Sequence, residues 1–452
     1  MRDLAIIGFL AALLALGLKR PFLFTLAYLY VDTVSPHRIS YYLLNSIPLS
    51  NIVAALALGG WLLFDARHGV KVTARHAILS FLLVYCWWTT LHAVAPVEAA
   101  LKWDWVWKTL VFALFVPFTL RTRLRVEACL LFLILSAGVI IITGGLKTVL
   151  GGGGYGQLSL FVNSNTGLYE GSTISAIAVA LVPVILWFAR HGTIFAPDWR
   201  VKCFSYALVF ACLLMPVGTE ARTGLVCIAV LGVLMLRDVK RRGAYLGLVA
   251  FLGICAMPLL PQSFQARMGL IQGYEQDSSA SSRLAVWGWT LEFAGANPMG
   301  GGFAAYHTNR LEVETVQVTE EGGVRSVVRR QQVDEGRAWH SAYFEMLGEQ
   351  GWPGLFLFLL LHGIGLYRME KIRRRYMREE GEKAWIAPLA TALQHFQIVY
   401  LVGAAFVAIA FTPFVHLMLA VQIGFDVLIG RREKAERPET GWGRPAAATA
   451  TA

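Results

Sequence analysis

Charged residues are scarce in this chain. Only 15% of its 452 residues are Asp, Glu, Lys or Arg, whereas 56% are hydrophobic. A soluble globular protein carries about 25% charged residues, and a soluble fold of this length could not bury so much apolar surface. Lipid must therefore solvate much of the chain, and the sequence predicts an all-α polytopic integral membrane protein.

Lysine is absent from one long polar stretch, residues 261–351, which nevertheless contains arginines and acids. Lys and Arg concentrate just outside it, in segments 237–242 and 368–383. Short loops rich in these residues stay on the cytoplasmic side of a membrane, and translocated loops are poor in them. We therefore expect 261–351 to form one large periplasmic loop, and the arginines that are kept there need a reason.

The large loop also lacks cysteine, and the whole chain lacks a C-x-x-C pair. All six cysteines lie in or at the edge of apolar runs: Cys86, Cys129, Cys203, Cys212, Cys227 and Cys255. This placement is typical of small hydrophobic side chains in helices and not of disulfides or zinc ligands. No Asp-x-Asp pair and no His/Cys ligand spacing occurs, so we expect neither a metal nor another cofactor.

A nucleic-acid partner is not expected either, although the formal net charge is +11. The basic residues cluster in short loops and at the tail, beside apolar segments. The retention of positive loops in the cytoplasm explains this pattern more simply than an electrostatic surface for nucleic acid. The expected surroundings are a lipid bilayer.

The apolar segments predict about 12 transmembrane helices. A span needs about 20 residues. The last run is long enough for two short helices broken near Pro413. The first two are short enough to share one crossing, and there are 13 spans if both cross. The runs are 4–18, 21–34, 46–64, 76–94, 106–120, 126–146, 172–189, 203–219, 222–236, 244–260, 352–367 and 396–429.

These runs divide the chain into four parts. Residues 1–260 are expected to hold the N-terminal transmembrane helices with short loops, and residues 261–351 the large periplasmic loop with the active site. Residues 352–430 hold the C-terminal transmembrane helices, and residues 431–452 form a disordered cytoplasmic tail. Basic short loops alternate with less basic ones along the chain, which supports this orientation.

Within the large loop the sequence predicts three elements. Residues 282–294 read as an amphipathic helix, because Leu284, Trp287, Leu291 and Ala294 would share one face. Residues 311–333 are rich in polar and β-branched types and predict a hairpin that turns at 321–323. Residues 341–348 read as a further helix that leads into the next span. The list of residues that could carry chemistry on this side is short: Arg222, Arg267, Arg283 and His340.

Each of these four residues could have a role other than catalysis, since an arginine can extend to lipid phosphate and a lone histidine is usually structural. Their combination points further. Guanidinium groups bind phosphate bidentately and stay charged, and imidazole suits proton transfer near neutral pH. Several arginines and one histidine at a membrane surface would suit a lipid-phosphate substrate and a hydroxyl nucleophile.

The segments that hold these residues resemble a known family. T-E-A-R-T-G, Q-S-F-Q-A-R, S-S-R-L-A-V-W, N-P-M-G-G-G-F and W-H-S-A-Y-F-E-M-L-G-E-Q-G-W-P-G follow one another as in bacterial O-antigen ligases and the related O-antigen polymerases. The resemblance covers about residues 160–365. The N-terminal third resembles the O-glycosylation ligases that are associated with exosortase systems.

This resemblance implies an inverting, metal-independent glycosyl transfer on the periplasmic face of the bacterial inner membrane. The donor would be a glycan on undecaprenyl diphosphate, and the acceptor a sugar hydroxyl of lipid A core. Arg222 and Arg283, with Arg267 as a looser match, would bind the diphosphate. His340 would take the proton from the acceptor hydroxyl. The family gives Glu220 and Glu345 no role.

Other functions remain open at this point. An O-antigen polymerase would use another lipid-linked glycan as acceptor, and one Arg-x10-Gly pattern of that type spans residues 337–348. The single large loop favours a ligase. A protein O-glycosylation ligase would use a protein acceptor. A lipid or sugar transporter would place its site near the bilayer midplane, whereas the unusual residues here collect outside it. A scaffold subunit would not need a catalytic histidine.

Overall fold

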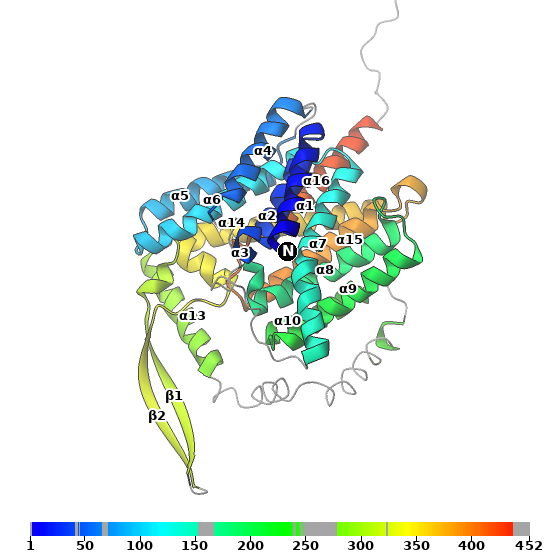
Figure 1. Cartoon of the computed structure of the whole chain (residues 1–452). Helices are drawn as coiled ribbons and strands as arrows, with labels where there is room; N and C mark the ends of the chain where they lie inside the picture. Colours follow the sequence, from blue (N-terminus) through cyan, green and yellow to red (C-terminus); the bar gives the residue numbers. More distant parts are fainter. Residues whose placement is uncertain are drawn as a thin grey trace, which may run out of the picture.

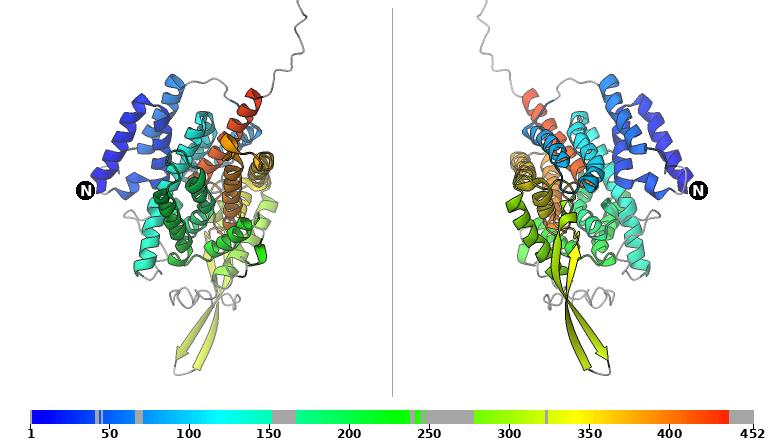
Figure 2. Two further views of the ribbon diagram at one scale, coloured as in Figure 1. Left: turned by 90° about the vertical axis from the view of Figure 1, so that its right-hand side faces the viewer. Right: turned by 90° about the vertical axis from the view of Figure 1, so that its left-hand side faces the viewer.

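The computed structural model describes residues 2–40, 44, 46–65, 71–151, 167–237, 241–244, 247, 278–321 and 324–436. Most of these residues form helices that pack into one bundle, and a single hairpin projects from it (Figures 1 and 2). The elements are α1 (Arg2–Lys19), α2 (Phe22–Val34), α3 (Pro36–Ile39), α4 (Leu49–Phe64), α5 (Ala74–Leu91), α6 (Pro96–Thr119), α7 (Arg123–Gly151), η1 (Gly167–Tyr169), α8 (Gly171–His191), α9 (Trp199–Gly218), α10 (Arg222–Met235), α13 (Ser278–Ala296), η4 (Ala305–Thr308), β1 (Arg310–Glu321), β2 (Val324–Glu335), α14 (Ala342–Tyr376), η5 (Gly381–Lys383), α15 (Ile386–Ala404) and α16 (Pro413–Ala435).

The apolar runs of the sequence become helices. Each run that lies within the described residues overlaps a helix. The last run overlaps two and is broken as expected, because α15 ends at Ala404 and α16 begins at Pro413. Most of the run 244–260 lies outside the described residues. In the described part of the chain, six helices are long and apolar enough to cross a membrane: α7, α8, α9, α14, Gly381–Ala404 and α16. The chain is therefore a mostly helical membrane protein.

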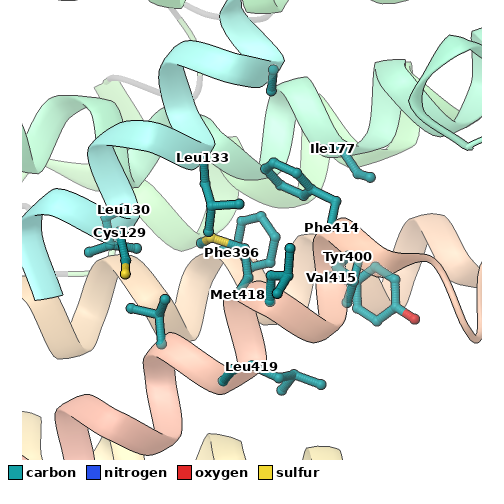
Figure 3. Close-up of a cluster of buried hydrophobic side chains, with 14 of the residues drawn as sticks. Cys129, Leu130, Leu133, Ile177, Phe396, Tyr400, Phe414, Val415, Met418 and Leu419 are labelled. Carbon is teal, nitrogen blue, oxygen red and sulfur yellow. The ribbon is translucent and has the colours of Figure 1, made fainter. Parts of the chain in front are cut away.

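The centre of the bundle is built by α7, α8, α15 and α16. α8 and α16 are apolar on nearly every side, and such helices are buried by their neighbours. Figure 3 shows their side chains interlocked in one cluster. The labelled members, all of them hydrophobic, are Cys129, Leu130, Leu133, Ile177, Phe396, Tyr400, Phe414, Val415, Met418 and Leu419.

The predicted hairpin is confirmed. β1 and β2 pair antiparallel over twelve positions, from Arg310 opposite Glu335 to Glu321 opposite Val324. The hairpin extends away from the bundle, and the C-terminal end of α16 lies at the opposite end of the molecule (Figures 1 and 2). Residues 322–323, where the turn was expected, lie between the two described strands.

The helix predicted at 282–294 exists as α13, and the side chains that it buries are mostly not those of the predicted apolar face. Ser282, Val286, Thr290 and Ala294 are buried, whereas Leu284 and Leu291 are 57% and 51% exposed. Four-residue steps place the buried set on one stripe, which packs against α14 and β1. Its small and β-branched side chains let the helix approach closely, and the two leucines point away.

The helix expected at 341–348 is the start of α14, which has Ser341 at its N-cap. A kink separates this first part from the membrane span that follows, because Gly351 has φ 63° and ψ −166°. A left-handed φ of this kind is easily adopted by glycine. Gly351 thus lets the chain turn between two helical parts, the one that follows the loop and the one that forms the span.

Candidate active site

The predicted site residues occupy the ends of helices. Arg222 is the first residue of α10, Arg283 lies in the N-terminal part of α13, and His340 immediately precedes the N-cap of α14. Arg267 lies outside the described residues. Three of the four predicted side chains can therefore be placed.

The charge of Arg283 acts on the His340 imidazole. Partial loss of solvation lowers the pKa of the His340 imidazole, and the positive charges of Arg283 and Arg337 lower that pKa further, while the carboxylate of Glu170 acts in the opposite direction. Arg283, Arg337 and Glu170 are therefore the charged groups that act on this imidazole. Because the His340 side chain is also exposed, a neutral imidazole is available to a substrate.

Arg222 lies at the same end of α8 as this group. The hydroxyls of Ser175 on α8 and Thr219, three residues before Arg222, lie 2.7 Å apart. Gly224 packs closely on Ser175, since a Cβ there would meet its side chain at 3.0 Å. The short turn between α9 and α10 is therefore fixed to the first turns of α8, and α8 begins directly after Glu170.

Both histidine and arginine motifs contain a strained backbone. His340 has φ 48° and Glu220, two residues before Arg222, has φ 52°. Residues other than glycine rarely adopt this left-handed conformation, and where they do the surrounding structure must enforce it. Such strain concentrates at functional sites; among the described residues Ser35 and Ala304 share it, and the other two, Glu220 and His340, lie in turns that carry predicted site residues.

The buried ring of Trp339 holds His340 in this conformation. Trp339 is only 1% exposed, and its backbone carbonyl accepts a hydrogen bond of 2.8 Å from the Trp287 indole. Gly348 leaves room for the ring, because a Cβ there would lie 2.4 Å from its Cζ2 atom. Trp287 in turn stacks on Phe344 at 4.9 Å between ring centres. Trp339 is thus anchored in an aromatic cluster, and the neighbouring His340 is left exposed.

Glu170, whose charge also acts on His340, was not singled out in the sequence. Its carboxylate caps α8 by accepting hydrogen bonds from the backbone N–H groups of Ser172 at 3.0 Å and Thr173 at 2.6 Å. Capping carboxylates are favoured at helix N-termini. The signal in the sequence was an acid directly before a long apolar run, on the side expected to be periplasmic.

The two glycine-rich segments, residues 298–302 and 348–352, are joined by backbone hydrogen bonds into what we call the clasp. The N–H groups of Gly301 and Gly302 donate to the carbonyls of Gly348 and Glu349, each at 2.9 Å. Trp352 N–H donates to Pro298 at 3.0 Å. The backbones approach so closely that a Cβ on Gly300, which has φ 91°, would lie 2.5 Å from the carbonyl oxygen of Glu349. This clasp fixes the base of the loop to α14, which starts beside His340.

A buried ion cluster lies beneath the clasp. The Nζ atom of Lys102 on α6 contacts Glu345 at 2.6 Å and Glu349 at 2.7 Å. Glu349 also accepts from the N–H of Ala304, and Glu345 from that of Ala410, both at 2.9 Å. Both carboxylates are committed to these partners, so neither is placed as a base for a substrate. Among the described residues, no group of three or more His, Cys, Asp or Glu side chains could hold a metal ion.

Two family models match this chain. Residues 207–359 match the model described as O-Antigen ligase, and residues 1–193 match a family of unknown function (DUF5935). No curated protein matches the chain. Arg222, Arg267, Arg283 and His340 all fall within the first match, whereas Glu170 and Lys102 fall within the second. The predicted resemblance to the O-antigen ligase superfamily is confirmed, and it supports glycosyl transfer of the kind that these ligases perform.

Proposed function

We propose, on the premise that residues 207–359 form an O-antigen ligase domain, that this protein transfers a glycan from undecaprenyl diphosphate to a sugar hydroxyl of lipid A core. The reaction is inverting and metal-independent, and it takes place at the periplasmic face of the bacterial inner membrane. The observation that carries the proposal is the exposed side chain of His340, which has a left-handed backbone next to the buried Trp339 and an imidazole on which the charge of Arg283 acts.

His340 acts as the general base. Its neutral imidazole takes the proton of the acceptor hydroxyl while the hydroxyl oxygen bonds to the anomeric carbon of the donor sugar. The bond from that carbon to the diphosphate oxygen breaks in the same step, with its electron pair leaving on the diphosphate. Attack from the face opposite the leaving group inverts the anomeric centre.

The arginines bind the diphosphate leaving group. Arg283 and Arg222, with Arg267 as a third ligand, bind the diphosphate oxygens through paired N–H groups and stabilise the charge that develops as the sugar leaves. Fixed guanidinium groups supply the positive charge that a divalent cation supplies elsewhere. The effect of the Arg283 charge on His340 supports this arrangement, since the acceptor and the leaving group flank the same carbon.

Glycan analysis of a deletion strain tests the function. We expect free lipid A core together with accumulated undecaprenyl-linked polymer, both returned to normal by the wild-type gene. Short unpolymerised units would identify an O-antigen polymerase instead. A glycosylation defect confined to proteins would identify a protein O-glycosylation ligase. Unchanged glycans would contradict the proposal and favour a transporter or scaffold of another pathway.

A further inference from the structure

The hairpin of β1 and β2 is long, and among the described residues no third strand lies beside it. Each strand has twelve residues, whereas a typical strand has about five or six, and the two form a sheet of their own. β1 contacts α13, and Leu311 near its start is buried, so the base of the hairpin is anchored. The rest projects away from the bundle (Figures 1 and 2).

Each strand therefore has an outer edge whose backbone N–H and C=O groups face no other strand in the described part of the chain. Such an edge is a template for a further strand, and many proteins protect it with a proline, a bulge or a short strand. Residues 310–335 contain no proline, and β1 pairs with β2 without interruption. An isolated two-stranded hairpin is only marginally stable in water, so a partner that adds a strand would stabilise this one.

The two strands carry charges of opposite sign. Residues 312–321 of β1 include four glutamates and no lysine or arginine, and residues 324–333 of β2 include three arginines and no acid. Within the hairpin only Glu320 is paired with an arginine, Arg325, and the other three glutamates of β1 are paired with uncharged residues. One outer edge is therefore acidic and the other is basic.

The directions of the strands match a second copy of the same chain. Copies in one membrane share one orientation, so their hairpins project the same way. β1 runs from the base to the tip and β2 returns, so β1 of one copy and β2 of a neighbour would run antiparallel at the same height, as adjacent strands of an antiparallel sheet do. This pairing places an acidic edge against a basic one, which is favourable, whereas β1 beside β1 would be parallel and would place like charges together.

We propose that the outer edge of β1 binds the outer edge of β2 of a second copy of this chain, so that one sheet continues across the two molecules. Because the contact joins unlike edges, it builds rings or rows of copies and not closed pairs. This contact is separate from the proposed glycosyl transfer and does not depend on it.

Disulfide crosslinking in cells tests the contact, with the full-length chain in a background without native cysteines. Thr319 and Ser326 are partners in the hairpin register, so Thr319→Cys in one copy should lie opposite Ser326→Cys in its neighbour, at a spacing that suits a disulfide. We expect a crosslinked product when two differently tagged copies, one with each substitution, are co-expressed. Either substitution expressed alone is the control and should give none. Equal crosslinking in these controls, or no product in the mixed sample, would overturn the proposal.

Charge variants test what joins the two edges. Changing both Glu320→Gln and Glu321→Gln should lower the yield of the mixed product by about fivefold, and added salt should lower the yield without these changes. The matched control, Glu379→Gln with Glu380→Gln, removes two neighbouring exposed acids that follow α14 and should leave the yield unchanged. Thermal unfolding shows whether both variants are folded. A yield that neither the hairpin variant nor salt reduces, or crosslinks that form only to a different protein, would contradict self-association through these edges.

Discussion

The His340 imidazole has three charged neighbours whose effects on its pKa differ in sign. Arg283 and Arg337 lower that pKa, and Glu170 raises it. If His340 is the base, transfer activity depends on the fraction of neutral imidazole. The rate should therefore rise with pH and level off above the pKa of His340, which lies below its ordinary value.

Two substitutions should move this pH profile in opposite directions. Arg337→Gln removes a positive charge, so the pKa of His340 rises and the midpoint of the rate profile moves to higher pH. Glu170→Gln removes a negative charge, so the midpoint moves to lower pH. Initial rates of transfer at saturating donor, measured across the imidazole range, report both shifts. Identical profiles in the wild type and both variants would argue against His340 as the titrating base.

The arginines are expected to act through geometry as well as charge. Arg222→Lys and Arg283→Lys keep the positive charge but lose the planar fork that binds a diphosphate bidentately. Both variants should fold and lose transfer activity by about 100-fold, the loss seen when one donor to a developing anion is removed. The comparison is made at the pH plateau of each variant, with unfolding followed in parallel. Near wild-type rates in both would refute the diphosphate role.

At the scale of elements, Gly348 makes space for the ring that anchors His340. A Cβ at this position would lie 2.4 Å from Trp339, whereas nothing lies within 4 Å of a Cβ on Gly363 of the same helix. Gly348→Ala should destabilise the protein by about 1–3 kcal/mol through overpacking and also reduce transfer. Gly363→Ala should leave both unchanged or slightly improve stability. Thermal unfolding in detergent and initial rates measure the two effects. If Gly348→Ala behaves like the control, Trp339 does not hold His340 in place.

The local elements of this fold were predictable, and the contacts between distant segments were not. A period of two and a glycine-containing turn define the hairpin, and long apolar runs define the helices, because each signal lies within a short window. The buried face of α13 could not be predicted, because Leu284 and Leu291 suit a helix face as well as Val286 does, and only packing on α14 decides between them. Lys102 lies 243 residues from Glu345 along the chain, so no local pattern joins them.

In the candidate site, too, local signals were predictable and contacts between distant segments were not. His340, Arg283 and Arg222 carried a signal because charged and titratable side chains stood next to apolar runs on one side of the membrane. The effect of Glu170 on His340 depends on how α8 packs, and Arg337 entered the sequence analysis only as the start of the Arg-x10-Gly pattern. The left-handed backbone of His340 follows from the burial of Trp339, which the sequence did not reveal.

At the scale of the whole molecule, the orientation in the membrane can be tested directly. In a background without native cysteines, Ser326→Cys places a thiol on β2, and Arg378→Cys places one on the basic segment 368–383. An impermeant thiol reagent added to cells with a permeable outer membrane should label position 326 and spare position 378, because lysine-poor loops are translocated and basic ones are retained. The reverse labelling would invert the topology and remove the proposed site from the periplasm.

The ion cluster beneath the clasp can be tested on its own. Lys102→Met leaves two buried carboxylates without their cation, and breaking a buried ion pair in this way destabilises a protein by about 3–5 kcal/mol. Lys108→Met on the same helix is the control, since Lys108 pairs with the largely exposed Asp104. Unfolding temperatures in detergent should therefore fall sharply for the first variant only. Equal stabilities would mean that Lys102 does not neutralise Glu345 and Glu349.

The buried ion cluster of Lys102, Glu345 and Glu349 also limits how this protein can recombine with others in evolution. Its cation belongs to the region matched by a family of unknown function, and its two carboxylates belong to the ligase region. The two regions are therefore not interchangeable modules. A recombination event that joined this ligase region to a foreign N-terminal half without an equivalent of Lys102 would produce a chain with two uncompensated acids in its interior. Selection should accordingly keep the two halves together as one inherited unit.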